Sequence, residues 1–156
     1  MALSLGIDRH VDRGEDVIDL RVPADPAYLA VIRTAMVGVA TRLDLTLDEI
    51  EDLRIAVDEA CALLIDQHHQ PDSWLHALFR VDVDTDQRGR EGRLDVRITG
   101  PRSDRPLQEG HPWMLLRALV DEVSSGMDAT GRWIALTHRS DSTGPTGSGA
   151  GEAARA

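Results

Sequence analysis

The apolar residues of this chain change their spacing near residue 70, and this change limits the folds that the chain can adopt. Over residues 29–43 and 50–64 they recur every three or four positions, which is typical of one buried face of a helix. Over residues 75–83 and 94–98 they alternate with other residues, which is typical of a strand with one buried side. The sequence therefore predicts two consecutive helices followed by a β-hairpin.

Further signals complete the order of the elements. Asp25-Pro26 and the Thr46-x-x-Glu49 pattern both indicate helix starts, because Asp and Thr side chains cap free backbone N–H groups. We also expect a first strand at 17–22, a third helix at 112–123, a last strand at 133–138, a turn at 84–92, a loop at 100–110 and the end of the second helix near 68–71. This order predicts an α+β fold, a two-layer α/β sandwich in which helices cover one face of a mostly antiparallel sheet.

A single domain accounts for most of the 156 residues. Residues 1–16 are weakly patterned, and residues 140–156 are rich in Ser, Thr, Gly, Pro and Ala without a bulky apolar side chain. Such segments bury too little apolar surface to offset the entropy lost on ordering. We therefore expect a disordered N-terminal segment at 1–16, a folded domain at 17–139 and a disordered tail at 140–156.

The composition excludes several classes of function. The net charge of −10 argues against nucleic-acid binding and against an anionic membrane surface, but it permits a basic protein partner. The chain has no lysine and no asparagine, so it can form no Schiff base, no Walker-type phosphate loop and no protein-kinase catalytic loop. The single Cys61 excludes an internal disulfide, and no apolar run is long enough to span a membrane, so we expect a cytoplasmic protein.

Glu59 is the first candidate for chemistry, because it lies in the second predicted helix among apolar residues. A partly buried carboxylate at such a position can act as a general base. A solvated acid on the helix surface explains the same pattern, and most acids on helix surfaces are exposed. The pattern alone favours the exposed alternative.

Four segments, in order along the chain, carry a family resemblance: LDLTLDEIE, DLRIAVDEAC, LLRALVDEVS and GRWIALTHR. Over residues 17–139 the chain resembles the serine-kinase-type anti-sigma factors, the RsbW-like family, which has the histidine-kinase and Hsp90-like ATPase fold. The resemblance implies a protein that binds an alternative sigma factor and keeps it from RNA polymerase. It also implies a kinase that uses ATP and magnesium to phosphorylate a serine of an anti-anti-sigma antagonist, and it makes a homodimer possible.

The nucleotide-site residues depart from the pattern of that family. The family's second helix carries Glu-x-x-x-Asn, a catalytic base followed by a magnesium ligand. Glu59 is retained here, whereas Leu63 stands at the asparagine position and has no lone pair for a metal ion. The family's Asp-x-Gly, whose aspartate reads the adenine amino group, is here Gly100-Pro101-Arg102. Gly100 offers no carboxylate, and Arg102 would crowd a place that needs glycine.

The phosphate-binding positions depart from the family as well. Its Gly-x-Gly motif is here Gly110-His111-Pro112, and Pro112 lacks the N–H that a phosphate cradle uses. The segment between residues 100 and 110 is too short for the usual ATP lid. We therefore expect a degenerate nucleotide pocket with a vestigial Glu59 and no cofactor. ATP and magnesium remain the cofactors if the pocket is functional.

The remaining candidates concern partners and packing. Arg33 falls at the position of a sigma-contacting arginine of the family, although its stem could simply cover the edge of the core. The acids between residues 44 and 59 are expected to form a solvated helix face, which would also suit a basic partner. The adjacent His68 and His69 lack a spaced third ligand, so no metal site is predicted. We expect the tryptophans to pack, and Trp113 is a candidate to fill part of the pocket.

The sequence thus favours an anti-sigma factor that sequesters an alternative sigma factor by direct binding, with an anti-anti-sigma protein as its antagonist. One alternative is an active ATP-dependent serine kinase of the same family. The other is a pseudokinase-like regulatory module that binds another signalling protein.

Overall fold

The structure is a computed structural model, and it describes residues 15–65, 72–86, 89–104, 107 and 110–142. Five strands form one antiparallel sheet in the order β1-β2-β3-β5-β4. Their bounds are Glu15–Pro23 (β1), Trp74–Asp86 (β2), Gly89–Gly100 (β3), Glu122–Asp128 (β4) and Gly131–Ser142 (β5). The helices are Leu29–Ala40 (α1), Leu47–Leu64 (α2) and His111–Leu119 (α3), with short 3₁₀ turns at Pro26–Tyr28 and Thr41–Leu43.

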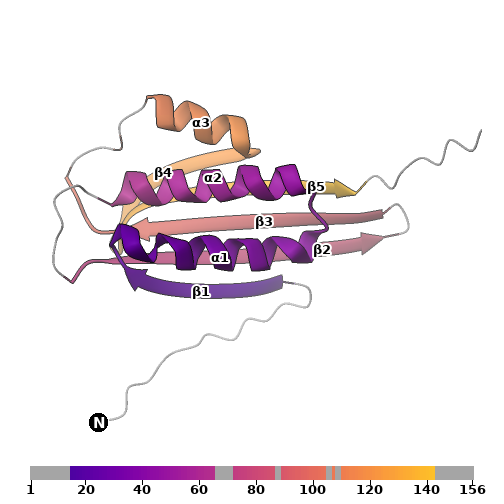
Figure 1. Cartoon of the computed structure of the whole chain (residues 1–156), viewed down its shortest axis with the longest axis horizontal. Coiled ribbons are helices and arrows are strands. Elements are labelled where there is room, and N and C mark those ends of the chain that lie inside the picture. The colour runs from indigo at the N-terminus through magenta and orange to yellow at the C-terminus, as the bar shows by residue number, and fades with distance from the viewer. Residues whose placement is uncertain (1–14, 66–71, 87–88, 105–106, 108–109, 143–156) are drawn as a thin grey trace, which may run out of the picture.

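The three α-helices lie on one face of the sheet, and α1 and α2 run antiparallel beside each other (Figure 1). The core fills the space between the two layers. Alternate residues of β2, such as Phe79, are fully buried there, as are Ile32 of α1 and Leu53 of α2. The α+β prediction, with helices on one face of an antiparallel sheet, is therefore confirmed.

Both predicted helix starts are confirmed. Asp25 accepts a hydrogen bond from the Ala27 N–H at 2.8 Å and caps the 3₁₀ turn that leads into α1. Thr46 and Glu49 form a reciprocal capping box at the start of α2. Each such cap typically stabilises its helix by about 1 kcal/mol.

Several predicted element boundaries differ from those of the structure. The expected turn at 84–92 is narrower, because β2 continues to Asp86 and β3 starts at Gly89. The third helix ends at Leu119 rather than 123, since Val120 is extended and the Asp121 N–H donates to the Thr137 carbonyl at 3.0 Å. The chain then forms β4, which was not predicted. The helix α2 ends at Leu64, and residues 68–71, where its end was expected, lie outside the described part of the chain.

The first and last strands of the chain, β1 and β5, extend slightly past the predicted domain. β1 begins at Glu15 and β5 ends at Ser142, whereas the expected bounds were 17 and 139. The single-domain assignment itself stays a prediction, and residues 1–14 and 143–156 lie outside the described part of the chain. Among the described helices, none is long and apolar enough to cross a membrane.

Candidate functional site

The helix α2 places the first two predicted site residues one turn apart. Glu59 is half-buried, and its side chain makes no hydrogen bond or ion pair with another described residue. Leu63 is partly buried and packs against the core. Residues four apart lie on the same face of a helix, so a carboxylate and an aliphatic side chain share this face. Of these two positions, only Glu59 presents a polar side chain.

Gly100 ends β3 in close contact with the last turn of α2. A Cβ atom on Gly100 would lie 2.9 Å from Leu64 Cβ and 3.1 Å from the Leu64 carbonyl oxygen. Gly131 is equally confined from the other side, because its Cβ would lie 2.1 Å from the Gly100 oxygen, and its φ of +144° favours glycine. Position 100 therefore has no room for a side chain unless α2 shifts.

A buried cation next to this position was missed by the sequence-based reasoning. Arg132 is directly opposite Gly100 in the β3–β5 pairing, and only 6% of its surface is exposed. Ile134 and Leu136 are buried at alternate positions of the same strand, so Arg132 faces the helix-covered side. The sequence did carry a signal for this placement, because Arg132 is two residues before Ile134 and so falls on the same side of the strand as Ile134 and Leu136.

The start of α3 has few free backbone donors. Gly110 is its N-cap, and Pro112 in the first turn has no N–H. The Trp113 and Met114 N–H groups both donate to the Gly110 carbonyl, at 3.0 and 3.1 Å. Within the described part of the chain, the His111 N–H of the first turn donates no hydrogen bond. Trp113 itself is buried in the core cluster.

Arg102 lies in the loop after β3 and reaches the β4–β5 turn, where its Nη1 lies 3.4 Å from the Ala129 carbonyl oxygen. The C-terminal ends of α2 and β3 lie at one end of the sheet, where the loop toward α3 also begins (Figure 1). The structure therefore brings Leu63 and Gly100 to the same region. It directs Arg102 toward the neighbouring turn.

No metal centre is evident in the described residues, since they contain no group of three or more His, Cys, Asp or Glu that could hold an ion. The His68-His69 pair lies outside the described part of the chain. Cys61 is buried in the core, and this burial raises the pKa of its thiol to about 12. A thiol of this kind is inert as a nucleophile and as a metal ligand.

Arg33 forms an ion pair between the two long helices. Its Nε donates to Asp58 Oδ1 at 2.9 Å, and its Nη2 lies 2.9 Å from the same oxygen. About a third of each side chain is exposed, 35% for Arg33 and 34% for Asp58. The acids between residues 44 and 59 therefore form only partly a solvated face. Asp58 pairs with Arg33 of α1, and Glu51 pairs with Arg54 of its own helix.

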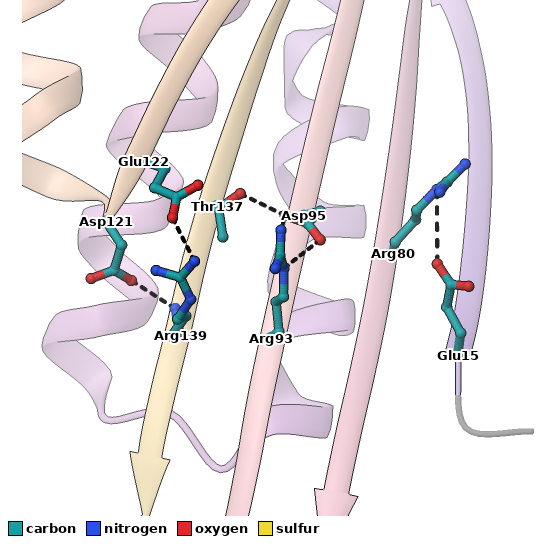
Figure 2. Close-up of polar contacts among 8 residues, drawn as sticks. All are labelled: Glu15, Arg80, Arg93, Asp95, Asp121, Glu122, Thr137 and Arg139. Atoms are coloured by element: carbon teal, nitrogen blue, oxygen red, sulfur yellow. Dashed lines mark hydrogen bonds and ion pairs between the residues drawn. The ribbon is translucent and has the colours of Figure 1, made fainter.

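The sheet face opposite the helices carries a second set of polar contacts (Figure 2). Asp95 accepts hydrogen bonds from Arg93 Nε at 2.7 Å and from the Thr137 hydroxyl at 2.5 Å. Arg139 pairs with Glu122, and its backbone N–H donates to Asp121 at 2.7 Å. These contacts link β3, β4 and β5 across the face.

Two tryptophans also lie on this face. The guanidinium carbon of Arg21 is 4.6 Å from the centre of the Trp74 ring, and that of Arg97 is 4.4 Å from the centre of the Trp133 ring. Trp74 is 43% exposed, so it packs against Arg21 at the surface and not in the core. Stacking on arginine takes the place of core packing for these rings.

Comparisons with known proteins agree with this architecture. A family model described as a histidine kinase-like ATPase domain matches residues 22–138. The serine-protein kinase RsbW of Bacillus subtilis (strain 168) is 47% identical over 115 residues, which cover 71% of this chain and 68% of that protein. This chain belongs to the RsbW family. The serine-protein kinase RsbW of Halalkalibacterium halodurans is 29% identical over 134 residues, covering 78% of this chain and 82% of that protein.

A solved structure supports the same fold for this RsbW family member. The crystal structure of the RsbU and RsbW domains of a Mycobacterium tuberculosis protein aligns with a TM-score of 0.52 at 16% identity. The alignment covers 79% of this chain but only 32% of that longer chain. The likeness therefore concerns the fold, and the predicted membership of the anti-sigma factor and serine-kinase family is confirmed by the sequence relatives.

Proposed function

We propose that this RsbW family member is an anti-sigma factor that holds an alternative sigma factor by direct protein contact and does not transfer phosphate. The observation that carries the proposal is the packing of Gly100 against Leu64, at the position where the family resemblance places the adenine-reading aspartate. Release of the sigma factor is then expected from competition by an anti-anti-sigma antagonist. A homodimer in the cytoplasm belongs to the same proposal.

The residues at the metal position support this proposal. Magnesium prefers oxygen ligands, and phosphoryl transfer depends on the metal to neutralise charge on the phosphates. The side chain of Leu63 supplies no oxygen and packs against the core instead. Glu59 alone cannot replace the missing ligand and also act as a base.

The adenine and phosphate positions point the same way. Arginine donates hydrogen bonds but accepts none, so the buried Arg132 cannot replace a carboxylate that accepts from the adenine amino group. A phosphate bound at a helix start needs free backbone N–H groups, and Pro112 removes one of them from α3. The residues present do not fit a magnesium–ATP complex, and no step of the proposed function uses one.

Titration calorimetry with magnesium and ATP tests the nucleotide part of the proposal. We expect no binding heat at micromolar to millimolar ATP, whereas the RsbW of Bacillus subtilis serves as the control protein in the same buffer. Micromolar affinity of this chain for ATP would overturn the proposal of a non-catalytic site.

Co-purification tests the partner part. Arg33 lies half-exposed on the surface of α1 and α2, and a guanidinium there can pair with a carboxylate of a sigma factor. We expect a sigma factor to co-purify with the chain and Arg33→Ala to weaken that complex. A chain that captures no sigma factor from its own cells would contradict this function.

An active serine kinase is the second candidate, because Glu59 is retained and unpaired among the described residues. In that case the chain would phosphorylate its antagonist in the presence of magnesium and ATP, and Glu59→Gln would abolish the reaction. We expect no phosphorylation by either form. Transfer of labelled phosphate by the unmodified chain and not by Glu59→Gln would favour the kinase.

A further inference from the structure

The contact between Arg33 and Asp58 leaves much of the arginine unused. The Nε and Nη2 atoms of Arg33 both approach Asp58 Oδ1, each at 2.9 Å. A guanidinium has five N–H donors, so this contact occupies one edge of it and leaves the others for a second acceptor. Within the described residues, neither Arg33 nor Asp58 has another hydrogen bond or ion pair.

The pair orders the arginine more than it stabilises the fold. A half-exposed ion pair contributes little to folding stability, because solvent screens it. An arginine side chain, however, has among the largest rotamer entropies of any residue, and a binding partner must order it. An arginine that Asp58 already holds in place loses less entropy when a partner binds.

We propose that Asp58 is a positioning residue that holds the Arg33 guanidinium in place for a carboxylate of the sigma factor. This inference rests on the proposed function, and it assigns to Asp58 a role in binding rather than in nucleotide chemistry. The partner carboxylate accepts hydrogen bonds from the remaining N–H groups of Arg33, while Asp58 keeps its contact with Nε and Nη2. Binding therefore does not require the internal pair to break.

A double-mutant cycle on the full chain tests the inference, with the co-purifying sigma factor as the probe. We expect Asp58→Ala to weaken the complex about three- to tenfold, the usual effect of freeing one long interface side chain. Arg33→Ala should weaken it at least as much. In the Arg33→Ala background, Asp58→Ala should cause no further loss, because Asp58 acts through Arg33.

The matched control is Asp82→Ala, which removes the same charge from an exposed residue of β2, outside the acidic run of residues 44–59 and without a hydrogen bond or ion pair in the described structure. It should change the affinity by less than about twofold. The conservative Asp58→Asn keeps an oxygen acceptor and should retain part of the binding. The inference would be overturned if Asp58→Ala reduced the affinity equally in the presence and in the absence of Arg33. It would also be overturned if Asp58→Ala bound more tightly, because Asp58 would then compete with the partner for Arg33.

Nitrogen-15 relaxation of the Arg33 Nε–Hε group gives a readout that needs no partner. We expect an ordered group in the unmodified chain and a mobile one in Asp58→Ala. A mobile Arg33 in the unmodified chain overturns the inference whatever the sigma factor does. An ordered Arg33 in a chain that binds no sigma factor instead refutes the proposed function, and with it the role given to Asp58.

Discussion

At the residue scale, Glu49 combines two contacts at the start of α2. One of its oxygens accepts the Thr46 N–H and hydroxyl, each at 2.7 Å, and the other lies 3.6 Å from His138 Nε2. The Thr46 backbone and side chain hold the pKa of Glu49 below its ordinary value of 4.5, burial opposes them weakly, and His138 adds to the lowering. The charged form is thus the stabilising one.

This lowered pKa gives a pH-dependent prediction. Because the folded pKa is depressed, the stabilisation is fully present above about pH 4.5 and is lost as the pH falls through the folded value. Glu49→Gln removes only the charge, so it should lower the free energy of unfolding by up to about 1 kcal/mol at pH 7. Urea unfolding at several pH values should show this difference shrinking in acid. Asp48→Asn, in the same turn but outside the cap, should change less, and a difference that does not vary with pH would contradict the assignment.

Gly100 supports a prediction about packing. A Cβ there would press on the backbone and Cβ of Leu64, whereas a Cβ on Gly110 would meet only Pro112 Cδ at 3.8 Å. Gly100→Ala should therefore lower the free energy of unfolding by about 1–3 kcal/mol, the usual effect of overpacking. Gly110→Ala should be nearly neutral. Thermal or urea unfolding measures both variants, and equal effects at the two positions would show that Gly100 is not confined.

At the element scale, Asp95 joins β3 to β5 on the open face of the sheet (Figure 2). Partial burial raises the pKa of Asp95, but hydrogen bonds from Arg93 and Thr137 outweigh it, and the pKa lies below its ordinary value. Asp95→Asn should lower the free energy of unfolding by about 1 kcal/mol at pH 7. Since the pKa is depressed, this loss should fade below about pH 4. Asp82→Asn, an exposed acid on β2, is the control and should have little effect at either pH in urea unfolding.

The elements show where sequence periodicity succeeds and where it does not. It identifies α1, α2 and the strands of the hairpin, because their buried faces repeat regularly. It misses β4, where Ser124, Ser125 and Gly126 are poor strand formers and Val120 and Val123 continue a helical spacing. Pairing with β5 overrides these local preferences. An edge strand with most of its residues exposed leaves no alternation to detect.

The sequence predicts some features of the candidate site and misses others. The family resemblance places Glu59, Leu63 and Gly100, since motif positions can be aligned without coordinates. It gives no sign that Gly100 packs against Leu64 or that Arg33 pairs with Asp58. The second contact joins residues 25 positions apart on different helices, and only their tertiary packing brings them together.

At the scale of the whole molecule, the first and last strands of the chain, β1 and β5, define the smallest fragment that should fold. Ser140 is buried in β5, and a Cβ on Gly92 of the paired strand would lie 2.6 Å from its hydroxyl. The free energy of unfolding of a fragment of residues 15–142 should lie within about 0.5 kcal/mol of that of the full chain. A fragment of residues 17–139 should have a clearly lower free energy of unfolding. Urea unfolding of the three chains makes the comparison. Equal stability of the two fragments would show that neither the first residues of β1 nor the last residues of β5 contribute to stability.

The borders of the sheet have a consequence for the protein at high concentration. Among the described strands, β1 and β4 each have one side without a neighbour, and such borders can recruit strands of other molecules into fibrils. β1 carries two acids at its start, further charges at Asp19 and Arg21, and a terminal proline. β4 is only seven residues long and has an acid at each end. Together with the net charge of −10, these charged borders should resist fibril growth.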